Sequence, residues 1–224
     1  MCDYLVLRKS PEAVFKHLVE TLKYPLDETQ IQNLAMYREN LVTYRPSGRT
    51  LFEDPFVILS TGVPKKYWVG PLRWGIQIRE NSPIETMIPN HSLSNMNWGR
   101  AFKERRCLVL VTGFVYRKMV SENSRLFYTH FKDDRIFTLP AIYQTSYGYD
   151  SHAFALTNVS PSLHLARLGY NNMPAILNTK NGYKWLRPNV QQYDLGCLLQ
   201  TYEDSAIETT EVHTLAHVGE SWID

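Results

Sequence analysis

The stretch RCLVLVTGFVYR, residues 106–117, decides the fold class of this chain. Its segment CLVLV, residues 107–111, is a short run of β-branched and aliphatic residues, which is typical of a buried strand. Similar runs separated by turn signals lie on both sides of it, at 56–60, 72–78, 126–131, 135–143 and 152–157. They do not alternate regularly with helices, which argues against a doubly wound parallel sheet. The sequence therefore predicts an α+β fold, with a curved, largely antiparallel β-sheet or barrel-like core flanked by short helices.

Short helices are expected around these strands. After a first strand at residues 2–8, Ser10 and Pro11 begin a helix, with serine as its cap and proline in its first turn. Asp27 and Gln30 have the spacing of a capping box, so a second helix is expected to begin at Asp27. The other expected elements are a helix at 97–106, a helical stretch from about residue 180 to 202 that breaks at Pro188, and a last strand at 213–218.

The composition is that of an ordinary globular protein. The chain has 224 residues, of which 44% are hydrophobic and 21% charged, and we expect a single domain spanning residues 1–224. The formal net charge of +2 neither requires nor excludes nucleic acid, because a local basic groove can coexist with a balanced total. There is no signal-peptide pattern and no apolar run of about 20 residues, so no membrane association is expected.

Cysteine and histidine usage argues against a metal site. Cys2, Cys107 and Cys197 are an odd number of cysteines without a CxxC pair, so neither a disulfide framework nor a thiolate zinc site is expected. His213 and His217 have the i,i+4 spacing of a helical metal pair, but their segment is expected to be a strand and no third ligand is evident. We expect no metal and no cofactor, and a reducing, cytoplasmic setting.

Ordered motifs spread over nearly the whole chain resemble those of one family. The central stretch 106–117 matches a family motif R-C-L-V-P-A-D-G-F-Y-E-W, and YNNMPAIL at 170–177 matches H-x-R-M-P-x-I-L. The other matches are Met1-Cys2, Tyr44-Arg45-Pro46 for N-x-x-P, Arg73-Trp74-Gly75, a strand ending in Thr157, and Trp185-Leu186. Each motif alone is weak, and their order and spacing carry the case. The chain resembles the SRAP family, whose members recognise abasic sites in single-stranded DNA.

The resemblance implies a partner and a set of contacts. The partner is single-stranded DNA carrying abasic sites, captured through Cys2, and the family is also credited with a peptidase-like processing of its own N-terminus. Nothing in the resemblance specifies an oligomeric partner. The positions carried over as DNA contacts are Arg45, Pro46, Arg73, Trp74, Thr157 and Asn172.

The chemistry of Cys2 follows from its place in the chain. Initiator methionine is normally removed before a small residue, and Cys2 then carries a free α-amine and a thiol on adjacent carbons. The amine, with a pKa near ~8, is partly neutral at pH 7 and can form a Schiff base with an aldehyde. The thiol then closes onto the imine carbon to give a thiazolidine. If Met1 is retained, Cys2 has no free amine and this reaction cannot occur.

The acid–base positions of the family are filled differently here. The family's glutamate falls on Tyr116, its histidine on Tyr170, and the following arginine on Asn172. Tyrosine, with a pKa near ~10, can donate a hydrogen bond but is a poor base at pH 7. We therefore expect slower opening of the abasic sugar, with His164 and Glu104 as candidates for compensation. The two tyrosines could also stack on a base or sugar, or simply fill the core.

The family's DNA-orienting asparagine has two candidates. Asn90 keeps the better spacing from Trp74 and to Gly113, whereas Asn81 keeps more of the motif's letters; we favour Asn90. Asp3, beside the cysteine, is expected to disfavour the approach of a phosphate. Basic residues that could contact phosphates cluster in the middle of the chain, near Trp68, Trp74 and Trp98: Arg45, Arg49, Arg73, Arg79, Arg100, Arg105 and Arg106.

Two hypotheses therefore remain open. In the first, the protein crosslinks covalently to abasic sites through Cys2, which the retained cysteine favours. In the second, it is a relative that binds single-stranded DNA or a protein partner without crosslinking, which Tyr116 and Tyr170 favour. Whether the protein is an enzyme depends on which of the two holds.

Overall fold

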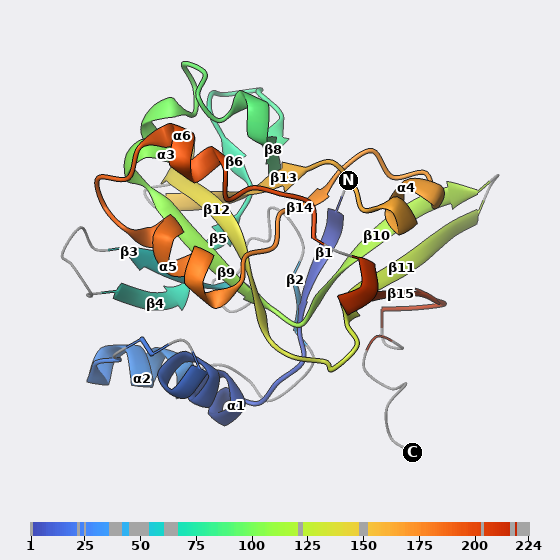
Figure 1. Ribbon diagram of the computed structural model, residues 1–224, viewed down its shortest axis with the longest axis horizontal. Helices are drawn as coiled ribbons and strands as arrows, with labels where there is room; N and C mark the ends of the chain where they lie inside the picture. The colour runs from blue at the N-terminus through green and yellow to red at the C-terminus, as the bar shows by residue number, and fades with distance from the viewer. Residues whose placement is uncertain are drawn as a thin grey trace.

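Two largely antiparallel sheets meet in the middle of the stretch 106–117, at Thr112 between β9 and β10. Figure 1 shows the two sheets. The computed structural model describes residues 2–21, 23–24, 26–35, 42–44, 54–60, 67–120, 123–147, 152–202, 204–215 and 218. Strand β9 (Arg106–Val111) belongs to one sheet and β10 (Gly113–Val120) to the other. The Thr112 backbone N–H donates to the carbonyl oxygen of Val6 at 2.7 Å, and its hydroxyl accepts from the N–H of Arg8 at 3.0 Å. This residue therefore ties the first strand to the junction of the sheets.

The first sheet contains the N-terminal strand. Its order is β15-β11-β10-β1-β2, and all of these strand pairs are antiparallel. The strands are β1 (Cys2–Leu7), β2 (Val42–Tyr44), β11 (Asn123–Phe131) and β15 (Ile207–Val212), with β10 in the centre. Because β1 lies between β10 and β2, the N-terminus is held inside the sheet and not on a free arm.

The second sheet carries most of the core. Its main path is β14-β13-β12-β9-β3-β4, and β5 and β8 pair in parallel with β13. Its strands are β3 (Phe56–Ser60), β4 (Tyr67–Pro71), β5 (Arg73–Trp74), β8 (Met87–Pro89), β12 (Phe137–Thr145), β13 (His152–Val159) and β14 (Met173–Pro174), besides β9. A small hairpin joins β6 (Ile76–Gln77) to β7 (Ile84–Glu85).

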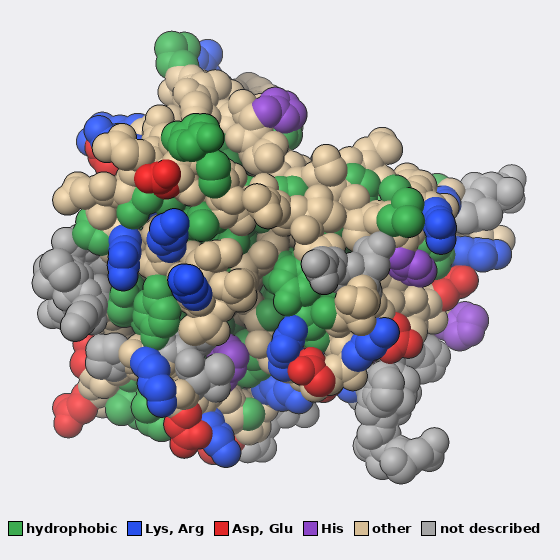
Figure 2. Space-filling model, in the orientation of Figure 1, with side chains coloured by type: hydrophobic (Ala, Val, Ile, Leu, Met, Phe, Trp, Pro, Cys, Tyr) green, Lys and Arg blue, Asp and Glu red, His purple; other side chains and the backbone are tan. Residues whose placement is uncertain are grey.

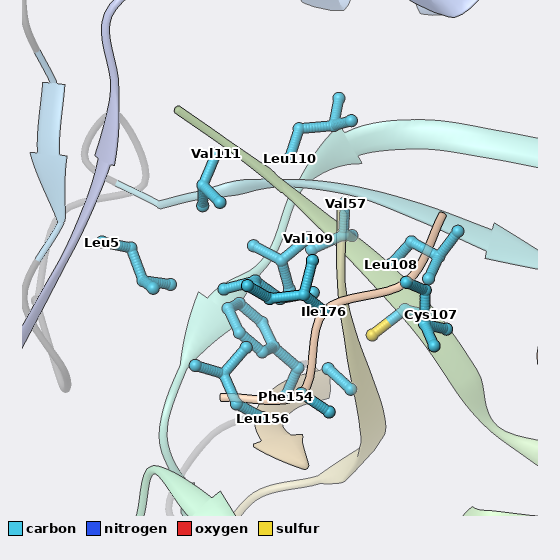
Figure 3. Close-up of a cluster of buried hydrophobic side chains, with 14 of the residues drawn as sticks. Leu5, Val57, Cys107, Leu108, Val109, Leu110, Val111, Phe154, Leu156 and Ile176 are labelled. Atoms are coloured by element: carbon cyan, nitrogen blue, oxygen red, sulfur yellow. The ribbon is translucent and has the colours of Figure 1, made fainter. Parts of the chain in front are cut away.

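These pairings confirm the predicted α+β class and its largely antiparallel character. Within the described residues the sheets are not closed into a barrel, so the barrel-like alternative is not the arrangement found. Every residue of β9 is buried, and Figure 3 shows its side chains beside those of Leu5, Val57 and Phe154 from β1, β3 and β13. β9 is thus the centre of the core, as the sequence of residues 106–111 indicates.

The helices begin largely where their caps predict. Helix α1 (Pro11–Lys16) is capped by the Ser10 hydroxyl, which accepts from the N–H of Ala13 at 3.3 Å, and a π-helical turn (His17–Thr21) follows. Before α2 (Glu28–Ala35), Asp27 and Gln30 form the expected reciprocal capping box, with N···O distances of 2.8 and 2.9 Å. The other helices are α3 (Gly99–Glu104), α4 (Leu163–Arg167), α5 (Thr179–Leu186) and α6 (Gln192–Gly196), with short 3-10 turns at Asn90–Ser92 and Asp204–Ala206.

Three expected elements differ in the structure. The expected strand at 72–78 is two strands, because Gly75 adopts a φ of 112° between β5 and β6. The helical stretch expected at 180–202 breaks near Pro188 as predicted, with Asn189 at a φ of 61° between α5 and α6, but it ends at Gly196, earlier than expected. The expected last strand at 213–218 is wrong where it can be checked: β15 ends at Val212, and residues 213–215 form a bend and turn. No helix among the described residues has the length and apolar character needed to cross a membrane.

Candidate functional site

A β-bulge at Asp3 places Cys2. In the pairing of β1 with β10, Cys2 lies opposite Tyr116 and Tyr4 lies opposite Val115, so two steps along β1 match one step along β10. Asp3 is the extra residue, and its carboxylate accepts a hydrogen bond at 2.8 Å from the backbone N–H of Arg117. The side chain thus satisfies a backbone donor at the interruption of the ladder. Bulges of this kind re-aim side chains and are frequent beside active sites.

The bulge also decides which face of the sheet Cys2 occupies. In a regular strand, residues 2, 4 and 6 would point to the same side. Here Cys2 packs in the main core together with Leu5 and Leu7, whereas Tyr4 and Val6 pack in a second cluster on the other side of the sheet. If residues 2–4 paired regularly, without the bulge, Cys2 would point to the side of Tyr4 and so toward the second cluster.

The thiol of Cys2 is enclosed. The residue is 1% exposed, and its Sγ donates to the carbonyl oxygen of Tyr4 at 3.4 Å. Burial, followed by the negative charge of Asp3, raises the pKa of the Cys2 thiol well above its usual range. The thiolate is the reactive form of cysteine, so this thiol is protonated and unreactive toward alkylating reagents at neutral pH in the closed site.

Tyr116, the strand partner of Cys2, contacts both Tyr170 and Asn172. The ring of Tyr170 stacks on that of Tyr116, with centroids 4.2 Å apart and planes at 29°. The hydroxyl of Tyr116 donates to the backbone carbonyl of Asn172 at 3.0 Å, and Phe127 contacts the Tyr170 ring edge to face. Residues that are far apart in the sequence therefore meet at one place beside the N-terminal strand.

The tyrosines of this cluster are hydrogen-bond donors at neutral pH. Burial raises the pKa of Tyr116 well above its usual range, with further contributions from Cys2, Tyr170 and Asp3. Burial, and then the charge of Asp3, raises the pKa of Tyr170 to about 12. Neither phenol can serve as a general base near pH 7, in agreement with the expectation from tyrosine chemistry.

The end of α4 positions Tyr170. The N–H of Tyr170 donates to the carbonyl oxygen of Leu165 at 3.1 Å, after Gly169 at a φ of 86°. The ammonium of Lys118, on β10, donates to the carbonyl oxygen of Leu168. The loop is therefore tied to the strand that carries Tyr116. A side chain at residue 169 would be strained by the backbone conformation and would also approach Lys118 Nζ to 3.2 Å.

Asn90 lies near this cluster in the sheet, although no contact places it on Cys2. Pro89, immediately before it, and Pro174, two residues after Asn172, both pair with Asn158 of β13. The Asn90 side chain is exposed at the start of a 3-10 turn. Asn81, the other candidate, lies in the turn between β6 and β7 at a φ of 62°. The choice of Asn90 as the DNA-orienting residue stays a prediction.

The other expected site residues are placed in different ways. Trp74 is 1% exposed and its indole N–H donates to the carbonyl of Thr86 at 2.9 Å, so its ring is a core group and not a stacking platform. Thr157 is fully buried and its hydroxyl donates to the carbonyl of Pro140 at 3.1 Å. His164 is exposed on α4, and Arg73 is partly buried on β5. Arg45 and Pro46 lie outside the described residues.

Arg106 from the expected basic cluster is a structural residue. Its guanidinium donates to the carbonyl oxygens of Trp185 and Arg187 at 2.6 Å and of Phe102 at 2.8 Å, and also to that of Lys103. Burial lowers the pKa of Arg106 to about 10, which leaves it charged at pH 7. It joins the ends of α3 and α5 and is not available to phosphate. In the described part of the chain, no group of three or more His, Cys, Asp or Glu side chains could hold a metal ion.

Two contributors to the site have no clear signal in the sequence. Asp3 is noticeable there only as an unfavourable charge, whereas the structure makes it the bulge residue that places Cys2. Lys118 and Leu168 are separated by 50 positions, and their contact follows from the fold alone.

Comparison with known proteins gives the family. The family model described as SOS response associated peptidase (SRAP) matches residues 1–219. A phage-related protein of Bordetella bronchiseptica superposes with a TM-score of 0.71 at 14% identity, covering 95% of each chain. A protein of Bacteroides thetaiotaomicron gives 0.69 at 17% identity, covering 95% of this chain and 93% of the other. No curated protein matches the sequence. The structural likenesses agree in fold, and the family match over almost the whole length shows that this chain belongs to the SRAP family.

Proposed function

We propose that this protein binds single-stranded DNA and captures abasic sites covalently through Cys2 after Met1 is removed. The observation that carries the proposal is the convergence at Cys2. The family resemblance locates its glutamate, histidine and arginine at residues 116, 170 and 172. These three residues lie together beside the strand that begins with Cys2. Their separation in the sequence makes this meeting a property of the fold.

The capture step balances without an oxidant or a cofactor. The α-amine of Cys2 adds to the aldehyde carbon of the ring-opened sugar, and one water molecule leaves as the imine forms. The thiol then adds across the imine, with the sulfur bonding to carbon and the thiol proton passing to nitrogen. The product is a five-membered thiazolidine ring, and the adduct is one water lighter than the sum of protein and DNA.

The cluster supplies hydrogen bonds to the sugar instead of a general base. The Tyr170 hydroxyl and the Asn172 amide oxygen are buried and find no hydrogen-bond partner among the described residues. A buried polar atom without a partner is costly, so a bound ligand that satisfies both atoms is favoured. The hydroxyls of a ring-opened sugar offer a donor to Asn172 and an acceptor to Tyr170. Sugar opening without a carboxylate base is slower, by about 10²–10⁴-fold for each positioned group that is missing.

A specific observation also supports the non-crosslinking alternative. Cys2 is 1% exposed and lies opposite Tyr116, one of the two stacked tyrosines, and Asp3 is the carboxylate whose charge acts on both rings. Capture requires the Tyr170 ring to move aside, whereas reversible binding of a strand over the stack does not. The two functions therefore differ in whether residue 2 becomes accessible when DNA binds.

The experiment is a denaturing gel with matched variants. Protein from which Met1 has been removed is incubated with a single strand carrying one abasic site, and a slower band resistant to denaturation is expected for the wild type. Cys2→Ala keeps a small second residue, so methionine is still removed and the α-amine is free, but no thiazolidine can form. Cys197→Ala, at an exposed cysteine, is the control for unrelated thiols. A band of equal strength from Cys2→Ala, or none from the wild type, would exclude capture by Cys2.

A further inference from the structure

One part of the chain contains no acidic residue over a long distance. Between Asp150 and Asp194 there is no Asp or Glu, and this is the longest such stretch in the sequence. It includes α4, β14, α5 and the start of α6, and it carries four basic residues: Arg167, Lys180, Lys184 and Arg187. Figure 2 shows a group of Lys and Arg side chains over the part of the molecule where Figure 1 places α3 and α5.

The basic residues of α5 face solvent without acidic partners. Four basic residues here are exposed: Lys180 and Lys184 on α5, Arg187 directly after α5, and Lys103 near the end of α3. None of these four lies within 4.0 Å of a carboxylate of the described residues. By contrast, Arg100 on α3 is paired with Glu104 at 3.2 Å. We call the four residues Lys103, Lys180, Lys184 and Arg187 the α5 basic face.

Helix stability does not account for all of these charges. Lys184 and Arg187 lie at the C-terminal end of α5, where the helix dipole favours cations. Lys180, however, is the second residue of the helix, where the dipole favours anions, and the first turn of α5 contains no acidic residue. A lysine at that position opposes the dipole, which indicates that its charge serves something outside the helix.

A groove with an exposed aromatic side chain borders the basic face. It has a volume of about 730 Å³ and is lined by residues of α3, of the α5–α6 connection and of α6, including Lys103, Tyr193 and Glu104, whose carboxylate is paired with Arg100. Tyr193 is 82% exposed, far more than a packing role needs. Arg106 fixes the groove because its guanidinium binds carbonyls at the ends of both α3 and α5. A rigid groove with cations and an exposed ring is the combination found in single-strand binders.

We infer that the α5 basic face contacts the phosphates of a single-stranded nucleic acid and that Tyr193 stacks on one of its bases. The inference rests on the proposed function for its ligand, since the strand is the one held at Cys2. Residues 172–179 connect Asn172 at the tyrosine cluster directly to the first turn of α5. The face thus extends the binding track several nucleotides away from the reacting sugar.

Charge-matched triple variants test the inference. The first combines Lys180→Gln, Lys184→Gln and Arg187→Gln. The second combines Lys16→Gln, Lys23→Gln and Lys132→Gln, which are also exposed but lie at α1, after the π-helical turn and after β11. Both change the net charge by the same amount. Binding of an undamaged 20-nucleotide dT strand is measured by fluorescence anisotropy at several salt concentrations.

The face variant is expected to lose about 2 units of the slope of log K against log salt, because each single-strand phosphate contact contributes about 0.7. Its Kd at low salt should rise at least tenfold, and Tyr193→Ala should raise it at least fivefold. The control triple should stay within twofold of the wild type. Equal losses in the two triples would overturn the inference. In the wild type, bound strand should protect Lys180 and Lys184 from acetylation, and unprotected lysines would likewise contradict it.

The same reagents separate this inference from the proposed function. A strand of three nucleotides with a central abasic site has only one nucleotide on either side of the captured sugar, and we expect it not to engage the α5 basic face. The face triple should therefore crosslink to it at the wild-type rate. The wild type could fail to crosslink while the two triple variants still differ in their binding of the dT strand. That result would reject capture by Cys2 and support the α5 basic face. Crosslinking in the wild type with no difference between the triples would reject the basic face alone.

Discussion

The ring of Tyr170 lies 4.2 Å from that of Tyr116, so a residue from the loop after α4 covers the strand partner of Cys2. The Cys2 residue itself is 1% exposed. The loop is anchored by the bond from Lys118 to the carbonyl of Leu168. We therefore expect that a ligand reaches Cys2 when this loop moves and that the position of Tyr170 controls the reactivity of the thiol.

Removing the Tyr170 ring should expose Cys2. In a Cys197→Ser background, which removes the exposed thiol, Tyr170→Ala is expected to speed the reaction of Cys2 with an aromatic disulfide reagent at least tenfold at pH 8. Tyr170→Phe keeps the ring and should stay within twofold of its parent. The alanine variant should also lose about 3 kcal/mol of unfolding free energy, as for other buried aromatic truncations. An unchanged reaction rate in the alanine variant would mean that Tyr170 does not cover the thiol.

Substitutions at Asp3 separate its charge from its hydrogen bond. Asp3→Asn keeps an oxygen for the N–H of Arg117 and removes the negative charge, so single-stranded DNA should bind about two- to fivefold more tightly. Asp3→Ala also removes the acceptor and should lose about 0.5–1.5 kcal/mol of unfolding free energy relative to Asp3→Asn. Anisotropy and urea unfolding measure the two effects. Identical stabilities of the two variants would show that the bulge does not depend on this bond.

The free energy of unfolding should fall at alkaline pH, and the buried thiol of Cys2 should account for part of that fall. Burial raises the pKa values of the Cys2 and Cys107 thiols, so the unfolded chain loses these protons first as the pH rises. Stability is therefore complete below about pH 8.5 and falls above it, by at most ~1.4 kcal/mol per pH unit for each thiol. Between pH 8.5 and 10, Cys2→Ala should reduce that fall by about 2 kcal/mol. Cys197→Ala is the control, and a Cys2→Ala curve parallel to that of the wild type would refute the assignment.

Gly113 should be intolerant of any side chain. An added Cβ would lie 2.3 Å from Cε2 of Tyr128 and 2.7 Å from the carbonyl oxygen of Thr129, a backbone atom that cannot easily move. Gly113→Ala is expected to cost about 1–3 kcal/mol of unfolding free energy. Gly196→Ala in α6 meets nothing within 4 Å and should be neutral or stabilising by up to about 1 kcal/mol. Urea unfolding of the two variants measures both effects. Similar losses of unfolding free energy in Gly113→Ala and Gly196→Ala would contradict the packing seen at Gly113.

The sequence predicts the core strands and the first helices well, because their signals are local. Strand β9 consists of an uninterrupted apolar run, and the Asp27–Gln30 capping box is made within four residues. Strand β10 escapes prediction because Arg117 and Lys118 interrupt its apolar pattern, although its pairing with β1 on one side and β11 on the other stabilises it. Strand β15 has the sequence IETTEV, whose mostly partly exposed residues give no strong strand signal. These two strands owe their conformation to hydrogen bonding with the neighbouring strands, and their own sequences do not predict it.

The candidate site is only partly predictable for the same reason. Family resemblance identifies Cys2, Tyr116, Tyr170 and Asn172, and the structure brings these residues together. No sequence pattern reveals that Asp3 interrupts the register, because a bulge is a property of two paired strands. Trp74 illustrates the opposite case: its motif matches, but its environment is the core, where its indole binds the carbonyl of Thr86.

The most direct test of capture by Cys2 is the intact mass of the adduct, followed by mapping of the modified peptide. Processed wild-type protein and an abasic single strand should give a species one water lighter than the sum of its parts, with the modification on residue 2. Cys2→Ala should give a comparable species only after reduction with borohydride, because its amine forms an imine that cannot close. An adduct mapped to a lysine, or no adduct from the processed wild type, would contradict the account.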